Sequence, residues 1–187
     1  MADVFKEALL FAIEAHDGVT RKTNNIPFIL HPMEVASIAA TITEDREVLA
    51  ACLLHDTVED ADVSQLEIQE RFGVRVAYLV SSETENKRRD MLPEDSWQIR
   101  KEESILELSR SNDRDVKILW LSDKLSNLRA FYRSKLKKGD KMWEVFHQRD
   151  PKKHEWYYRS ILEQLTELKD TLAYQEYVEL IEKIFGE

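Results

Sequence analysis

The sequence predicts an all-α fold, because turn-forming residues are scarce and apolar side chains recur at helical spacing. Only four glycines and four prolines occur among 187 residues, whereas an average protein contains about 7% glycine. A sheet-rich fold needs many tight turns, which glycine and proline usually form. The length and the 43% hydrophobic composition suit a single domain with a sizeable core. We therefore expect a single-domain, multi-helix bundle.

Helical periodicity and local signals place the elements of the first half. Asp3 can cap the first helix, and Pro32 suits the first position of the second. Ser64 and Glu67 have the spacing of a capping box, and Gly73 is a typical helix end. The expected helices are 4–16, 32 to about 40, 45–54 continuing into 55–60, 65–73 and 74–80.

The second half begins with a polar, highly charged segment from Glu83 to Asp95, which we interpret as a mobile loop closed by Pro93. Its basic run at residues 87–89 could contact phosphates, but a basic run in a polar loop is more often solvated surface. Asp150 and Pro151 signal the start of a long helix. The expected helices are 97–108, 113 to about 136, a short segment around Trp143, 151–169 and 174–185.

The helix expected over residues 113–136 carries two apolar faces. One face holds Ile118, Leu121, Leu125, Leu128 and Tyr132 at 3.6-residue spacing. The opposite face is also apolar except for Asp123 and Asn127, which lie one turn apart. Such a helix is expected in the middle of a bundle, where a buried carboxylate is costly unless a cation or hydrogen-bond donors satisfy it.

Composition excludes several classes of protein. The net charge of −9 and the pI near 5.2 argue against a nucleic-acid polymer as the main partner, although a small anion can bind in a basic pocket. Cys52 is the single cysteine and lies in an apolar run, which favours a buried, inert thiol. No signal peptide and no run of about 18 apolar residues is evident, so we expect no membrane partner and a cytoplasmic location.

Four residues form a candidate metal site: His31, His55, Asp56 and Asp123. Imidazole and carboxylate together suit Mn²⁺, Fe²⁺ or Zn²⁺. Taken singly, each residue is more often structural, and His31 before Pro32 could simply cap a helix. Their settings favour a ligand role, because the pair at 55–56 ends an apolar helix and Asp123 lies on a buried face.

Glu59 and Asp60 follow the His55–Asp56 pair immediately. If the helix continued through them, each would share a face with the ligand four residues before it. Four acidic or metal-binding groups within six residues repel one another unless a cation is present. The alternative is a solvated acidic helix end, although the helix dipole disfavours acidic residues there.

Resemblance to a known family is carried by four segments: Arg21–Pro32 (RKTNNIPFILHP), Leu53–Asp60 (LLHDTVED), Phe72–Gly73 and Leu121–Arg129 (LSDKLSNLR). They resemble the hydrolase domain of Rel/Spo-type alarmone enzymes, which belong to the HD-domain phosphohydrolase superfamily. The resemblance covers about residues 5–133, followed by a helical C-terminal part over 139–187. It implies one HD-type domain over residues 1–187, acting as a small stand-alone alarmone hydrolase.

By that resemblance, His31, His55, Asp56 and Asp123 are implied to bind one Mn²⁺. Glu59 and Asp60 are implied to orient and activate the attacking water. The implied reaction is hydrolysis of the 3′-pyrophosphate of guanosine tetra- or pentaphosphate, (p)ppGpp. Arg21 and Lys22 would supply positive charge, which would bind the pyrophosphate or guard the mouth of the pocket, and Asn127 would face the ribose.

Several positions depart from the family pattern, and they bear on base and ribose recognition rather than on the metal. Thr23 and Phe28 replace the common Ser and Tyr, Ala130 stands at a usual Thr, and residues 83–87 match the Val-Thr-Lys segment only loosely. Two other functions therefore stay open. One keeps the metal site but changes the substrate to a nucleoside monophosphate, a cyclic nucleotide or the 2′-phosphate of NADPH. The other is a catalytically silent helical module that binds a nucleotide or a protein.

Overall fold

The computed structural model describes residues 3–21, 25–61, 63–88 and 90–186, and these ranges form an all-helical bundle without β-strands, apart from an isolated bridge between Thr20 and Pro27. The all-α prediction is confirmed. The elements are α1 (Val4–Ala15), α2 (Leu30–Ala39), α3 (Arg46–Leu54), α4 (Thr57–Asp60), α5 (Gln65–Phe72), α6 (Val74–Ser81), α7 (Pro93–Arg110), α8 (Arg114–Lys138), η1 (Gly139–Val145), α9 (Pro151–Gln164), η2 (Thr166–Leu168) and α10 (Leu172–Phe185).

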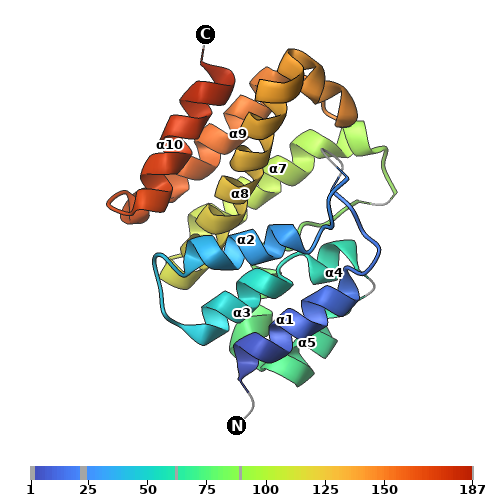
Figure 1. Cartoon of the computed structure of the whole chain (residues 1–187), viewed down its shortest axis with the longest axis vertical. Coiled ribbons are helices and arrows are strands. Elements are labelled where there is room, and N and C mark those ends of the chain that lie inside the picture. The colour runs from blue at the N-terminus through green and yellow to red at the C-terminus, as the bar shows by residue number, and fades with distance from the viewer. Residues whose placement is uncertain (1–2, 22–24, 62, 89, 187) are drawn as a thin grey trace.

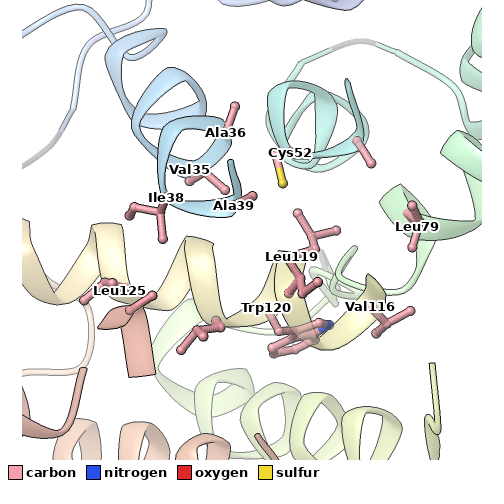
Figure 2. Packing of buried hydrophobic residues seen from close by; sticks show 14 of the residues in the cluster. Val35, Ala36, Ile38, Ala39, Cys52, Leu79, Val116, Leu119, Trp120 and Leu125 are labelled. Carbon is pink, nitrogen blue, oxygen red and sulfur yellow. The ribbon is translucent and has the colours of Figure 1, made fainter. Parts of the chain in front are cut away.

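Helix α8 runs through the middle of the bundle. Figure 1 shows α1, α3 and α5 at one end of the molecule, α9 and α10 at the other, and α8 between them. Helix α8 contacts α2, α3, α6 and α10 as well as both 3₁₀ segments. Leu119 and Trp120 of α8 are each at most 1% exposed, and Figure 2 shows α8 facing Val35 of α2 and Cys52 of α3. The predicted two-faced burial of this helix is confirmed.

Most helix starts follow the capping signals of the sequence. The side chains of Asp3, Ser64 and Asp150 each accept a hydrogen bond from a backbone N–H in the first turn of the helix that follows. Gly73 ends α5 with φ of 90°, a conformation that glycine adopts at no steric cost. Cys52 is fully buried, as predicted. Within the described ranges, no helix is long and apolar enough to cross a membrane.

The expected continuous helix through residues 45–60 is wrong, because the chain turns at His55 and Asp56 between α3 and α4. Side chains cause the break: His55 Nδ1 lies 2.8 Å from the Cys52 carbonyl, and Thr57 Oγ1 donates to the Leu54 carbonyl at 2.7 Å. These bonds satisfy carbonyls at the end of α3 and close the helix.

Other boundaries differ by a few residues. Helix α2 begins at Leu30, so Pro32 is its third residue rather than its first. Helix α7 begins at Pro93, four residues before the expected start, because proline fits the first helical position. Helix α9 ends at Gln164, and the rest of the expected helix to residue 169 is the 3₁₀ segment η2.

Candidate active site

Three helices bring the candidate ligands together. His31 lies in the first turn of α2, His55 and Asp56 occupy the turn between α3 and α4, and Asp123 lies in the middle of α8. His31 Nε2 is 2.9 Å from Asp123 Oδ1 and 3.5 Å from Asp56 Oδ2. His55 Nε2 is 3.1 Å from Asp56 Oδ2 and 3.5 Å from Asp123 Oδ1. Each imidazole Nε2 atom therefore lies within 3.5 Å of an oxygen of both aspartates, although Asp56 does not belong to the group of three residues whose donor atoms all lie within 4.8 Å of one another.

The remaining contacts of the two histidines direct both Nε2 atoms toward the two aspartates. Ser126 Oγ donates to Glu34 at 2.7 Å and lies 2.9 Å from His31 Nδ1, so Nδ1–H of neutral His31 donates to this oxygen. His55 Nδ1–H likewise donates to the Cys52 carbonyl. In these tautomers each Nε2 carries a lone pair, as a metal-bound histidine requires.

A cation fits this arrangement. His55 Nε2 is buried and has no hydrogen-bond partner among the described residues, which would be costly without a positive charge nearby. Although burial opposes protonation of His55, Asp56 and Asp123 raise its pKa well above the usual value, whereas burial lowers the pKa of His31. Donor atoms of His31, His55 and Asp123 lie within 4.8 Å of one another, as a bound metal ion requires.

The two oxygens of Asp123 have different partners. Oδ1 faces both imidazoles and accepts a hydrogen bond from Asn127 Nδ2 at 2.8 Å. Oδ2 accepts from Lys124 Nζ at 2.6 Å. Burial would raise the pKa of Asp123, but Lys124 and the two histidines hold it well below its usual range. The sequence analysis expected a cation or hydrogen-bond donors beside this buried carboxylate. Lys124, Asn127 and His31 are groups that contact it.

Glu59 and Asp60 lie on α4, directly after the turn that carries His55 and Asp56. The break between α3 and α4 removes the expected shared helix face of His55 and Glu59, although Asp60 N still donates to the Asp56 carbonyl at 2.8 Å. Burial and the nearby Asp56 raise the pKa of Glu59, against the opposing effect of Lys87. A carboxylate with a raised pKa is a better proton acceptor near neutral pH.

A cavity of about 420 Å³ joins these groups. Arg21 lines it and donates to Asn127 Oδ1 at 2.7 Å, so two residues predicted to bind substrate lie together. Lys22, predicted with them, lies outside the described residues. The cavity is also lined by both catalytic candidates, Glu59 and Asp60. Phe28, Phe131 and Phe146 form its aromatic wall.

Three lining residues were not found by sequence reasoning: Arg100, Lys101 and Lys124. Glu83, Glu85 and Lys87 belong to the segment that was expected to bear on base and ribose recognition. The interpretation of the basic run at residues 87–89 as solvated surface is wrong for Lys87. Its Nζ lies 2.9 Å from Glu59 Oε1 and 2.6 Å from Asp60 Oδ1. Arg88 pairs with Glu103, and Arg89 lies outside the described residues. Lys124 could have been suspected as a lining residue, since it follows Asp123 in a buried helix. The irregular segment that carries Glu83, Glu85 and Lys87 gives no periodic signal for the direction of its side chains.

Comparison with known proteins decides the family. An HD-domain family profile matches residues 8–147. The chain belongs to the HD-domain family. A protein of Aquifex aeolicus named guanosine-3′,5′-bis(diphosphate) 3′-pyrophosphohydrolase is 40% identical over 131 residues, which are 70% of this chain and 18% of the relative. A GTP pyrophosphokinase of Myxococcus xanthus is 30% identical over 130 residues, which are 68% of this chain and 17% of the relative.

Solved structures confirm the HD-type fold. One, described as a metazoan ortholog of SpoT that hydrolyzes ppGpp, has a TM-score of 0.80 and 25% identity over 100% of this chain and 98% of that one. A structure from Listeria monocytogenes has a TM-score of 0.73 and 31% identity over 84% of this chain and 99% of that one. The chain spans less than a fifth of the length of the two curated relatives described above.

Binding of a divalent cation should stabilise this HD-type site against unfolding. We expect Mn²⁺ at about 100 times its dissociation constant to add about 2.7 kcal/mol to the free energy of unfolding, because it binds the folded state alone. Asp123→Ala should abolish this gain, whereas Asp170→Ala, at an exposed position, should keep it. Thermal unfolding of chelator-treated protein with and without Mn²⁺ measures both. A full gain in the Asp123 variant would contradict the assignment.

Proposed function

We propose that this HD-domain chain hydrolyses the 3′-pyrophosphate of (p)ppGpp, releasing pyrophosphate and GDP or GTP, with Mn²⁺ as its metal. The observation that carries the proposal is that two buried imidazole Nε2 atoms each lie within 3.5 Å of oxygens of Asp56 and Asp123, beside the further pair Glu59 and Asp60. The activities for which the Aquifex relative and the metazoan protein are named support the substrate class.

In this proposal His31, His55, Asp56 and Asp123 are the metal ligands. Their nitrogen and oxygen donors suit a borderline-to-hard divalent cation, and no thiolate contributes. A bound cation would supply Lewis acidity to the phosphoryl oxygen and lower the pKa of water. The protein's part is to hold the donors rigidly: Ser126 and the Cys52 carbonyl orient the two histidines, and Lys124 and Asn127 orient Asp123.

Glu59 and Asp60 then orient the attacking water, and Glu59 takes its proton. The water oxygen forms a bond to phosphorus while the bond from that phosphorus to the ribose 3′ oxygen breaks. The ribose oxygen takes up a proton and leaves as a hydroxyl group, and the second product is pyrophosphate. The raised pKa of Glu59 supports its role as the proton acceptor.

Arg21, Lys22 and Asn127 bind the nucleotide in this scheme. The hydrogen bond between Arg21 and Asn127 supports a common role, and Asn127 also contacts Asp123, which links nucleotide binding to the metal end of the cavity. The cavity of about 420 Å³ suits a small-molecule nucleotide rather than a polymer. The role of Lys22 rests on its place in the motif.

Residues 1–187 act as one domain in this proposal, with the motif-bearing part at about residues 5–133 and the helical part at 139–187. Helix α8 supports this view, because it packs on α2 and α3 of the first part and on α10 of the second. The proposal also places the domain in the cytoplasm, where the sequence analysis expects it.

A release assay tests the proposed reaction. Purified protein with Mn²⁺ should release pyrophosphate from ppGpp and lose this activity in a chelator. NADPH, nucleoside monophosphates and cyclic nucleotides run in parallel distinguish the alternative substrates. Orthophosphate from NADPH or a monophosphate, or hydrolysis of a cyclic nucleotide, with ppGpp untouched would replace the substrate. Inactivity on every substrate, with no metal by elemental analysis, would leave the silent binding module.

A second experiment separates water activation from metal binding. Glu59→Gln should keep its bound metal but lower kcat by about 10²- to 10⁴-fold, the usual contribution of a general base. Metal content is measured by elemental analysis and kcat by pyrophosphate release. Loss of the metal from this variant would show that Glu59 is a ligand and that the division of roles is wrong.

A further inference from the structure

The segment between α6 and α7 presents alternate residues to the active-site cavity. Glu83, Glu85 and Lys87 line the cavity of about 420 Å³, whereas Thr84 and Asn86 do not. Such alternation is typical of an extended chain, in which successive side chains point to opposite sides.

Buried contacts with cationic side chains anchor this segment at two points. Glu83 is 6% exposed and accepts from Lys124 Nζ at 2.9 Å. Glu85 accepts from Arg100 at 2.9 Å and also pairs with Lys101. Although burial opposes it, these cations lower the pKa of Glu85 to about 2, so the carboxylate stays charged and paired. Lys87 is therefore carried by an anchored segment rather than by a free surface loop.

The same segment contacts the proposed water-activating pair directly. The backbone N–H of Glu85 donates to Glu59 Oε2 at 3.2 Å, and Lys87 Nζ lies within 2.9 Å of carboxylate oxygens of Glu59 and Asp60. The side chain of Lys87 is 34% exposed and lines the cavity. One face of the segment thus brings a cation to the Glu59 end of the site.

Charge balance shows why a cation is needed there. A phosphate attacked by water held at Glu59 and Asp60 must lie beside two carboxylates, which repel it. Of the described cations that line the cavity, Arg100 and Lys101 are paired with Glu85, and Lys124 is paired with Glu83 and Asp123. Arg21 contacts Asn127, close to Asp123 rather than to Glu59. Lys87 is the cation among them that contacts the Glu59–Asp60 pair.

We propose that Lys87 is a phosphate-binding residue of the active site, which contacts the pyrophosphate of the substrate beside Glu59 and Asp60. This inference rests on the proposed function and deepens it. Arg21 and Lys87 line the same cavity from the α1–α2 loop and from the α6–α7 segment, and in this proposal both bind anionic groups of the substrate. Such a pair of cations favours a diphosphate group over a single phosphate.

Binding of inorganic pyrophosphate tests this role without turnover. Isothermal titration calorimetry is run on the Mn²⁺-loaded protein, with Mn²⁺ matched in cell and syringe. Lys87→Met should weaken binding by roughly tenfold or more, because a charge-assisted contact is lost, and Lys87→Arg should restore most of it. Lys183→Met is the matched control, since Lys183 pairs with Glu179 on the surface of α10, and its affinity should equal that of the wild type.

Kinetics distinguish phosphate binding from a merely structural role. In the release assay Lys87→Met should raise KM for ppGpp by roughly tenfold or more, with metal content and thermal stability unchanged. If Lys87 only orients Glu59, kcat falls while the affinity for pyrophosphate is unchanged, and the inference is overturned. Absence of pyrophosphate binding by the wild type also overturns it. Pyrophosphate binding that depends on Lys87, in a protein inactive on ppGpp, would instead refute the proposed substrate and keep the binding site.

Discussion

The carboxylate of Asp123 is 3% exposed on the central helix, and each of its oxygens is held by different partners. One oxygen faces the imidazoles of His31 and His55, and the other accepts from Lys124. Removing one partner from a buried charged group costs about 3–5 kcal/mol, so such groups must be held together by the surrounding fold. The helices α2, α3 and α8 have to meet at this point for the charges to balance.

Helix α8 connects this charged centre to the rest of the bundle. Its apolar residues pack against the helices on both sides, while Asp123, Lys124, Asn127 and Phe131 line the cavity. The same helix orients the neighbouring histidine, because Ser126 links His31 to Glu34. The core of the fold and the alignment of the site therefore depend on a single helix, and a displacement of α8 would disturb both.

The features that could be predicted from the sequence are those that depend on the pattern of neighbouring residues along the chain. Helical spacing and capping residues indicated most helices, and an aspartate on an otherwise apolar face indicated the buried carboxylate. The turn after Leu54 could not be foreseen, because it depends on side-chain bonds to the carbonyls of Cys52 and Leu54 that compete with the helix. The partners of Lys87 could not be foreseen, because they lie 27 and 28 residues away along the chain and Lys87 itself lies in a segment without periodicity. Contacts of that kind arise only from the tertiary fold.

The account depends most directly on where a metal ion binds. Anomalous diffraction from a crystal of the Mn²⁺-loaded protein, measured near the manganese absorption edge, locates that ion without any assay of activity. We expect one peak enclosed by His31 Nε2, His55 Nε2, one oxygen of Asp56 and Oδ1 of Asp123. A peak elsewhere, or a peak that Asp123 does not contact because its carboxylate stays with Lys124, would contradict the account.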